Sequence, residues 1–361
     1  MNVGLVVPGF SADARDWCIP ALRHLARTLA EGDDVRVIAL RYPYAAGHYT
    51  VDGAEVIALG GAISRGPATF ALWRRTLQVL REEHARRPFD VLHAFWATES
   101  GLLAALAGRL QRIPTVVSLA GGELVALRDI GYGDQRIAWE RLKVAASLRL
   151  ATHVTAGSRQ LQVLGEHRLR NRKMHLAPLG VDTALFQEGR GDHAARLVHV
   201  GALTPVKDHV TLLRAFNQLL RHMPEARLEL IGGGPLERSL CELATSLGLD
   251  GSVCFRGEID HAMLPSVYRG ASACVVSSRH EAQCMVALEA AACGVPLVGT
   301  RVGVLPEVTS TVVPVRDPAA LAGALAASLR TEASATGSTE SIRKRFGLVA
   351  CTKRFRSLYA G

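Results

Sequence analysis

Glu281 and Glu289 are the two residues whose setting in this sequence points most directly to chemistry. Glu289 stands among small and aliphatic residues, with Val286–Leu288 before it and Ala290–Ala292 after it. An unpaired carboxylate in apolar surroundings costs several kcal/mol, so we expect Glu289 to have a polar partner. The neighbouring residues leave open whether that partner is a ligand or another group of the protein. In isolation, the two glutamates would also fit a helix start and an exposed helical position.

The segment around these glutamates predicts an anion site. We expect a helix to begin between Cys284 and Val286 and to end at Gly294-Val-Pro296. The first amides of a helix lack intrahelical partners and the helix dipole favours an anion there, which suits a diphosphate. Helical side chains tilt toward the N-terminus, so Glu289 would lean back toward that anion and accept hydrogen bonds from a ribose diol. Glu281, just before the helix, would lie near a group attached to the phosphates.

The overall composition is that of a globular protein with room for two domains. The chain has 361 residues, 48% of them hydrophobic, and no apolar run reaches the ~18 residues that a membrane span needs. The seven cysteines form no Cys-x-x-Cys pair. We therefore expect neither a disulfide framework nor a zinc site, and we predict a reducing, cytoplasmic location.

Short apolar runs alternate with helical patterns, which predicts parallel strands buried on both faces. Repeated strand–helix units are typical of an α/β protein with doubly wound sheets, and the number of strands favours two domains. The strands are expected at Val3–Val7, Val35–Leu40, Ala54–Leu59, Val91–Ala94, Thr115–Leu119, His153–Ala156, Lys173–Ala177, Leu197–Val200, Arg227–Ile231, Val253–Arg256, Ala273–Val276, Pro296–Gly299 and Thr311–Val313. Turn-rich residues place the domain boundary near 178–195, and residues 331–341 predict a mobile surface loop.

The positive charge of the chain leaves several interpretations open. The formal net charge is +9, with basic groups at Arg74, Arg75, Arg81, Arg86 and Arg87 and at Arg168, Arg170, Arg172 and Lys173. These groups fit peripheral contact with the anionic inner face of a membrane, an acidic acceptor, or solvated helix faces. Nucleic acid is not expected, because aromatic residues are only 5% of the chain and do not alternate with basic ones.

The segment from Glu281 to Pro296 resembles the donor-site signature of the family 4 glycosyltransferases, which have the GT-B fold. The pattern is Glu-x7-Glu followed by Ala-x-x-Cys-Gly-Val-Pro. Further segments are similar to the family in the same order: Asp90–His93, Leu179–Asp182, Val200–Asp208 with Thr211–Phe216, Ile231–Pro235 and Phe255–Gly257. The resemblance covers nearly the whole chain and is strongest over residues 197–308.

The resemblance implies a retaining, metal-independent hexosyltransferase that uses no cofactor. The enzyme would move a hexose-type sugar from a nucleotide-diphosphate sugar, its co-substrate, to a hydroxyl group of a glycan, a glycolipid or a small molecule. Glu281 and Lys207 would be catalytic. The donor would be bound by Glu289 at the ribose, by Lys207 at the diphosphate, by Arg256 beside the base, and by Gly201, Gln283, Cys284, Met285 and Val286.

The fold that the resemblance implies is α/β GT-B, with two Rossmann-like, doubly wound domains facing across a cleft. An N-terminal acceptor-binding domain would comprise residues 1–178 and a C-terminal helix at 345–361. A nucleotide-sugar-binding domain would comprise residues 179–344. The last segment, Ile342–Leu358, predicts one basic helix that Phe346, Phe355 and Tyr359 would anchor.

The acceptor side would be lined by residues of the first domain: Gly9, His93, Gly121, Gly122 and Glu123. The two glycines at 121 and 122 would present backbone amides to a substrate. His93 fits a packed core histidine as well as a catalytic one. Glu123 fits a loop cap as well as a ligand for an acceptor hydroxyl.

Three positions depart from the family pattern. Ala202 stands where an Arg usually follows the glycine of the phosphate loop, Ala282-Gln-Cys284 replaces Gly-Phe-Gly, and Ala120 replaces a His. A charge-assisted hydrogen bond is worth roughly 1.5–3 kcal/mol, so the missing Arg should be felt unless another cation such as Arg279 replaces it. These departures keep open a catalytically weakened partner subunit that binds a nucleotide sugar. A dehydrogenase is a weaker alternative, because Pro8-Gly-Phe-Ser11 follows the first strand instead of Gly-x-Gly-x-x-Gly.

Overall fold

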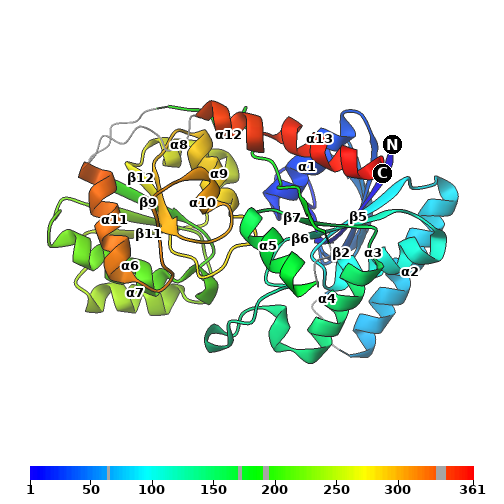
Figure 1. Cartoon of the computed structure of the whole chain (residues 1–361), viewed down its shortest axis with the longest axis horizontal. Helices are drawn as coiled ribbons and strands as arrows, with labels where there is room; N and C mark the ends of the chain where they lie inside the picture. Colours follow the sequence, from blue (N-terminus) through cyan, green and yellow to red (C-terminus); the bar gives the residue numbers. More distant parts are fainter. Residues whose placement is uncertain (63–65, 170–172, 190–194, 331–338) are drawn as a thin grey trace. The chain divides into compact units, whose positions relative to one another are not determined.

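Figure 1 shows a computed structural model of the chain, which describes residues 1–62, 66–169, 173–189, 195–330 and 339–361. The chain divides into two compact units. Unit 1 contains Met1–Gly180 and Leu348–Gly361, and unit 2 contains Val181–Gly347. The domains expected from the sequence, 1–178 with 345–361 and 179–344, have limits close to these. Among the described residues, no helix is long and apolar enough to cross a bilayer.

Unit 1 is built on an eight-stranded sheet in the order β3-β4-β2-β1-β5-β6-β7-β8. Its strands are β1 (Asn2–Gly9), β2 (Asp34–Tyr42), β3 (Ala46–Val51), β4 (Ala54–Leu59), β5 (Val91–Phe95), β6 (Thr115–Leu119), β7 (His153–Ala156) and β8 (His175–Leu176). Its helices are α1 (Pro20–Ala30), α2 (Pro67–Arg86), α3 (Glu99–Gln111), α4 (Ala138–Leu150), α5 (Arg159–Arg168) and α13 (Leu348–Tyr359). The described strand pairs are parallel apart from β3 with β4.

The sequence prediction missed β3. Its residues are mostly exposed, because the strand lies at the edge of the sheet and pairs with β4 alone. An edge strand lacks the continuous apolar run that marks buried parallel strands. Asp52 and Gly53 join β3 to β4, and both have positive φ, as the favoured two-residue hairpin turns require.

Unit 2 is built on a parallel six-stranded sheet in the order β11-β10-β9-β12-β13-β14. Its strands are β9 (Arg196–Val200), β10 (Arg227–Ile231), β11 (Val253–Gly257), β12 (Ala273–Val276), β13 (Leu297–Thr300) and β14 (Val312–Val313). Its helices are α6 (His209–Leu220), α7 (Glu237–Ser246), α8 (Leu264–Arg269), α9 (Met285–Ala292), α10 (Leu305–Val308), α11 (Pro318–Arg330) and α12 (Thr339–Phe346).

Two apolar clusters form the core of unit 2, one on each face of its sheet. Leu197 of β9 packs with α6 and α11, whereas the next residue, Val198, packs with α8 and α9. Successive strand residues point to opposite faces, so an unbroken apolar strand needs helices on both sides. Each unit is therefore a Rossmann-like, doubly wound α/β domain, as predicted.

The C-terminal segment forms two helices, so the prediction of one helix over Ile342–Leu358 is wrong. α12 ends at Phe346 and α13 begins at Leu348. The Phe346 carbonyl accepts a hydrogen bond from the amide of Val181 at 2.8 Å. Its partner is thus a residue outside the helix. A Cβ on the intervening Gly347 would lie 2.5 Å from the Arg343 carbonyl oxygen, which only glycine avoids.

The anchors predicted for this segment are confirmed. Phe346 is buried in the core of unit 2, and Phe355 and Tyr359 are buried in the core of unit 1. Of the loop predicted at 331–341, residues 331–338 lie outside the described residues. The remaining part, from Thr339, belongs to α12.

Candidate functional site

The predicted donor residues gather at the carboxyl edge of the unit 2 sheet. Gly201 directly follows β9, and Glu281 lies in the loop from β12 to α9. β9 and β12 are paired neighbours, but the helices that follow them, α6 and α9, pack on opposite faces of the sheet. This divergence makes the edge a topological switch point, where doubly wound sheets bind their ligands.

Lys207 and Glu281, the predicted catalytic residues, form an ion pair. The Lys207 ammonium donates to Glu281 Oε1 at 2.6 Å, and the Ser278 hydroxyl donates to the same oxygen at 2.6 Å. Their side chains are only 22% and 13% exposed. Burial raises the pKa of the Glu281 carboxyl, but the Lys207 charge and the two hydrogen bonds outweigh burial and hold this pKa below its ordinary value. The Glu281 carboxyl is therefore ionised at neutral pH.

Backbone contacts hold the two loops that carry this pair together. The Ser277 hydroxyl donates to the Lys207 carbonyl at 2.7 Å, and the Arg279 amide donates to the Val206 carbonyl at 2.8 Å. Asp208 then turns the chain into α6 with a φ of +51° and caps that helix through the Thr211 amide at 3.3 Å. Aspartate tolerates this left-handed conformation better than most residues. Arg279, the candidate replacement cation, thus lies in the loop that faces Lys207.

Glycines allow the loop after β9 to approach its neighbour closely. The Gly201 amide donates to the Ile231 carbonyl at the end of β10 at 2.9 Å. A Cβ on Gly232 would lie 2.3 Å from the Gly201 carbonyl oxygen, so no other side chain fits there. Ala202, at the position where the family has an Arg, is exposed.

The N-terminus of α9 lies just after Glu281, as predicted. Cys284 is its N-cap residue, with φ +81° and ψ 79°, a left-handed conformation that costs energy for a residue with a Cβ. The side chain makes no capping hydrogen bond and is buried in the apolar core, and burial raises the pKa of its thiol. Met285 and Val286 form the first turn, where helix amides lack intrahelical partners. Cys284 is therefore a packing residue in a backbone position that suits glycine.

Gln283 ties the same loop to the segment that follows β13. Its carbonyl accepts from the Val304 amide at 2.8 Å, and its side chain amide lies 3.4 Å from the Met285 sulfur. Gly303 has a φ of +54°, and a Cβ there would lie 2.5 Å from the Gln283 carbonyl oxygen. Gly303 is thus a supporting residue of the site that the sequence analysis missed.

Glu289 has the polar partner that we expected, and the protein supplies it. The Tyr268 hydroxyl of α8 donates to Glu289 Oε2 at 2.9 Å, and His261 Nε2 lies 3.5 Å from Oε1. The Glu289 residue is only 7% exposed. Burial raises the pKa of the Tyr268 hydroxyl well above its ordinary value, and the Glu289 charge adds to this, so the hydroxyl keeps its proton and stays a donor. Neither Tyr268 nor His261 was a predicted site residue.

Arg256, predicted to lie beside the base, belongs to an ion-pair cluster. Its guanidinium donates to Glu229 at 3.1 Å, and Glu229 also pairs with Arg196. Arg256 and Arg196 line a cavity of about 200 Å³ together with Met263, the N-cap residue of α8. Among the described residues, Arg256 donates its side-chain hydrogen bond to Glu229, which is not one of the residues predicted to bind the sugar donor.

Two buried histidines lie behind Lys207, and the sequence analysis missed both. The His199 and His209 rings meet edge to face with centroids 4.7 Å apart. His199 Nδ1 lies 2.8 Å from the Val275 carbonyl oxygen. Burial lowers the pKa of His199 to about 4 and that of His209 to about 2, and the Lys207 charge adds to both shifts. Both rings are therefore neutral at neutral pH and add no positive charge beside Lys207.

Glu123 in unit 1 caps its own loop. Its carboxylate accepts from the amides of Ala97 at 3.2 Å, Ala120 at 3.0 Å and Gly121 at 2.7 Å, and the residue is 1% exposed. The Gly121 amide is thereby used within the protein. A Cβ on Gly122 would lie 2.9 Å from the Tyr132 ring, so Gly122 serves close packing. Of the two interpretations of Glu123, the structure supports the loop cap.

His93 lies in the core of unit 1. It is fully buried, with Nδ1 at 2.7 Å from the Tyr359 hydroxyl and Nε2 at 2.7 Å from the Ser118 hydroxyl. Burial lowers the pKa of His93 to about 3. These contacts correspond to the packed core histidine and tie the C-terminal α13 to the sheet.

Gly9 ends β1 in a tight contact. A Cβ there would lie 3.0 Å from the Tyr42 Cβ, so Gly9 lets β1 and β2 end side by side. At the same edge, Trp96 follows β5 with a φ of +65°, and a Cβ on Gly121 would lie 2.8 Å from its indole nitrogen. A strained residue at the carboxyl edge of a sheet often marks a functional position, and the sequence analysis did not single out Trp96.

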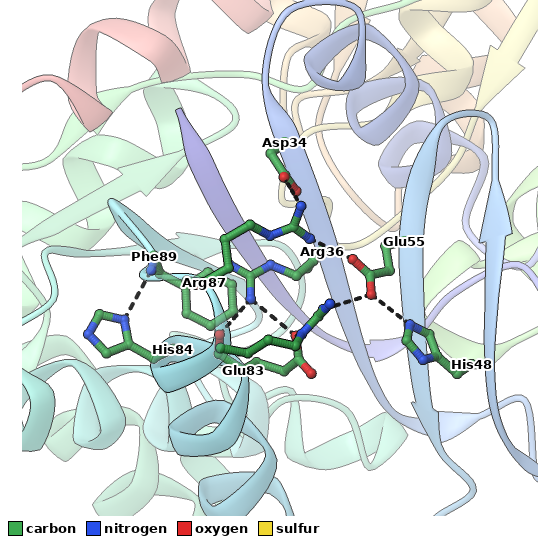
Figure 2. A network of polar contacts seen from close by, with 9 residues as sticks. Asp34, Arg36, His48, Glu55, Glu83, His84, Arg87 and Phe89 are labelled. Carbon is green, nitrogen blue, oxygen red and sulfur yellow. Dashed lines mark hydrogen bonds and ion pairs between the residues drawn. The ribbon is translucent and has the colours of Figure 1, made fainter.

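Figure 2 shows a polar network at the C-terminal end of α2. Arg36 of β2 is fully buried there, with its guanidinium carbon 3.8 Å from the Phe89 ring centroid. It donates to the backbone carbonyls of Glu83 at 2.8 Å and Arg87 at 2.6 Å, and to the Glu83 carboxylate at 3.1 Å. These three hydrogen bonds engage Nη1 and Nη2 of the guanidinium, and a buried charge needs such partners.

Arg86 and Arg87, two of the arginines expected to face an anionic surface, belong to this network. Arg86 pairs with Glu83 at 2.6 Å and Glu55 at 2.8 Å, and Arg87 pairs with Glu55 at 2.7 Å and with Asp34. The charges of both arginines are therefore largely balanced within the protein, as Figure 2 shows for Arg87. In the second basic group, Arg170 and Arg172 lie outside the described residues.

Two protein families match the chain. The family described as "Glycosyl transferase 4-like domain" matches residues 19–180, and the family described as "Glycosyl transferases group 1" matches residues 194–331. The first match covers most of unit 1. The second contains Lys207, Glu281 and Glu289.

Solved structures share the fold along the whole chain. Sucrose-phosphate synthase from Thermosynechococcus elongatus has a TM-score of 0.80 at 21% identity, covering 100% of this chain and 98% of that one. HepE of Anabaena, solved in complex with UDP and glucose, has a TM-score of 0.78 at 17% identity, covering 100% of both chains. The two Rossmann-like units thus have the GT-B fold that the sequence predicted.

Relatives of higher identity are D-inositol 3-phosphate glycosyltransferases. The one from Saccharomonospora viridis is 33% identical over 305 residues, covering 76% of this chain and 70% of the relative. The one from Acidothermus cellulolyticus is 32% identical over 280 residues, covering 69% of this chain and 62% of the relative. The chain thus spans less than two thirds of the Acidothermus protein's length. With its Glu-x7-Glu segment at the switch point of a GT-B domain, the chain belongs to the family 4 glycosyltransferases.

Proposed function

We propose that this protein is a retaining, metal-independent glycosyltransferase that moves a hexose-type sugar from a nucleotide-diphosphate sugar to an acceptor hydroxyl. The observation that carries the proposal is the Lys207–Glu281 ion pair, which lies directly before the N-terminus of α9. The names of the 32–33% identical relatives support it. They do not favour the alternative of a catalytically weakened partner subunit.

In this proposal unit 2 holds the donor. The diphosphate lies between the Lys207 ammonium and the first amides of α9, which supply positive charge and hydrogen-bond donors. The ribose hydroxyls donate to Glu289 Oε1, whose contact with His261 is long at 3.5 Å. Tyr268 keeps its hold on Oε2 at 2.9 Å. The buried carboxylate is then oriented before the donor arrives, which lowers the entropy cost of binding.

The chemical step needs stabilisation of the leaving diphosphate. An acceptor hydroxyl attacks the anomeric carbon on the face from which the diphosphate departs, and the bond from that carbon to the phosphate oxygen breaks. The departing oxygen accepts the acceptor's proton, so Ala120 at the usual His position does not block the reaction. Lys207 and the α9 amides oppose the growing negative charge. Glu281 keeps the Lys207 side chain charged and in place.

The acceptor binds to unit 1 in this proposal, at the carboxyl edge of its sheet near Gly9 and Trp96. Glu123 and His93 act there by positioning, because their polar atoms are engaged within the protein. D-inositol 3-phosphate is the first acceptor to test, since relatives of 32–33% identity are named for it. UDP-glucose is the first donor to test, since HepE of Anabaena was solved in complex with it. The cytoplasmic location stays a prediction, as does the exclusion of nucleic acid.

A donor and acceptor panel tests the proposal. Release of nucleoside diphosphate is measured for the protein, for Lys207→Gln, and for Lys344→Gln as a matched control on an exposed lysine of unit 2. We expect acceptor-dependent release, a loss of about a hundredfold in kcat for Lys207→Gln, and no change for Lys344→Gln. Nucleoside diphosphate binding without release from any donor would instead support the weakened partner subunit.

A further inference from the structure

An exposed group of apolar side chains joins α2 to α4 on unit 1. We call it the aromatic patch, and it consists of Phe70, Trp73, Ile137, Trp139 and Leu142. Phe70 meets Trp73 edge to face at 5.6 Å between ring centroids, and Trp73 stacks on Trp139 at 6.4 Å with 11° between the planes. Phe70 is 58% exposed, Ile137 50%, Trp139 50% and Leu142 58%. Single exposed apolar residues are ordinary, but a contiguous group marks an interaction surface.

Hydrogen bonds fix the Trp73 ring, on which the aromatic patch packs. Its indole nitrogen donates to Glu99 Oε1 at 2.5 Å. Arg41 grips the same carboxylate with two hydrogen bonds of 2.7 and 2.8 Å. This bidentate ion pair fixes the orientation of the indole ring. The outer rings, Phe70 and Trp139, are therefore presented on a prebuilt support, so little side-chain entropy is lost when they bind.

Basic residues flank the aromatic patch. Arg74 and Arg141 are exposed and each is next in sequence, or nearly so, to a patch tryptophan. Neither makes an ion pair with a carboxylate in the part of the chain that the structure describes, whereas the acidic residue beside Trp139, Glu140, is paired with Lys143 at 2.7 Å. At the C-terminal end of α2, Arg86 pairs with Glu55 and Glu83, and the C-cap residue Arg87 pairs with Glu55. Two exposed arginines of α2 and α4 thus lie next to the tryptophans of the aromatic patch.

We propose that the aromatic patch docks unit 1 onto an anionic lipid bilayer. Tryptophan and phenylalanine partition into the headgroup–acyl boundary, and each arginine near an anionic surface adds to the attraction. Arg74 and Arg141 beside the aromatic centre give this surface the charge that an anionic bilayer attracts. The sequence had placed such contact on the basic groups, and the structure moves it to the start of α2 and α4.

Docking through the aromatic patch also has a consequence for the acceptor. Both α2 and α4 begin on the side of the sheet where the parallel strands end, since each follows a strand of unit 1. A bilayer held by their first turns would present its headgroups at the edge where Gly9 and Trp96 lie. This second step rests on the proposed function, whereas the docking itself does not. It adds hydroxyl groups of membrane lipids to the acceptors to be tested beside D-inositol 3-phosphate.

Vesicle flotation tests the docking with the full chain. The vesicles are phosphatidylcholine alone or phosphatidylcholine mixed with phosphatidylglycerol. We expect binding to the anionic vesicles that salt weakens, and a loss of at least about tenfold for the double variant Phe70→Ser, Trp139→Ser, because burial of one large apolar side chain is worth about this factor. Arg74→Gln with Arg141→Gln should weaken binding to anionic vesicles and reduce its salt dependence.

The matched control is Leu110→Ser with Val163→Ser, which removes two exposed apolar side chains elsewhere on unit 1, 72% and 66% exposed. This control should bind like the parent. The docking proposal is overturned if the parent binds neither vesicle, if the aromatic double variant binds as well as the parent, or if the patch instead causes self-association without vesicles. Donor turnover with a soluble acceptor, measured without vesicles, should be unchanged in all these variants. Vesicle binding without any donor turnover would defeat the proposed function alone.

Discussion

The Cys284→Gly variant should be more stable than the Cys284→Ala variant. This reverses the usual order, in which alanine is the more stabilising of the two residues. Cys284 has φ +81° and ψ 79°, and a left-handed backbone costs roughly 1–2 kcal/mol for a residue with a Cβ. Glycine avoids this cost but loses about 0.5–1 kcal/mol through the greater freedom of the unfolded chain. The glycine variant should therefore exceed the alanine variant by about 0.5–1 kcal/mol in free energy of unfolding.

Alanine is the matched control because both variants lose the same buried sulfur. Cys284 is 6% exposed and packs in the apolar core, so both variants give up the contacts of the sulfur and differ only at Cβ. Urea unfolding, followed by circular dichroism, measures the difference. A glycine variant less stable than the alanine variant would refute the argument that the backbone at residue 284 is strained.

The remaining predictions concern the groups around this site. Tyr268→Phe leaves the buried Glu289 carboxylate short of a donor, so the free energy of unfolding should fall by about 1–3 kcal/mol in urea titration; an unchanged value would count against this contact. The pKa of Glu281 is lower in the folded protein than its ordinary 4.5. The stability difference between the protein and Glu281→Gln should thus be constant at neutral pH and shrink as pH falls below 4.5; a difference that grows with acid would contradict it. Burial lowers the pKa of His209 from 6.5 to about 2, so unfolding takes up a proton below pH 6.5 and acid destabilises the protein. Below pH 6.5, His209→Leu should reduce the slope of the free energy of unfolding against pH by about 1.4 kcal/mol per pH unit. An equal slope in the parent and the variant would exclude a neutral buried ring.

The parallel strands and the two-domain plan could be predicted because both depend on local patterns. Buried strands such as Thr115–Leu119 and Ala273–Val276 are continuous apolar runs, and the structure gives them the predicted limits. β3 lacked this pattern since it is an exposed edge strand. The break at Gly347 was missed because it depends on the Phe346 carbonyl and the distant Val181 amide.

The candidate site was predictable where motifs fix the residues, and unpredictable where tertiary partners decide their state. Spacing and resemblance pointed to Lys207 and Glu281, but the ion pair between them joins loops after different strands. Tyr268 is distant in sequence from Glu289, and no local signal in the sequence marks it as a partner. From the sequence, Glu123 fitted both a loop cap and a ligand for an acceptor hydroxyl. In the structure three backbone amides donate to its carboxylate, which corresponds to the loop cap.

Calorimetric titration with UDP tests the central claim that Lys207, Glu281 and the start of α9 form the donor site. The parent should bind UDP, and Lys207→Gln should bind it about ten- to a hundredfold more weakly, because a charge-assisted hydrogen bond is worth roughly 1.5–3 kcal/mol. Lys344→Gln should bind like the parent. Equal affinity of the parent and Lys207→Gln for UDP would contradict the account.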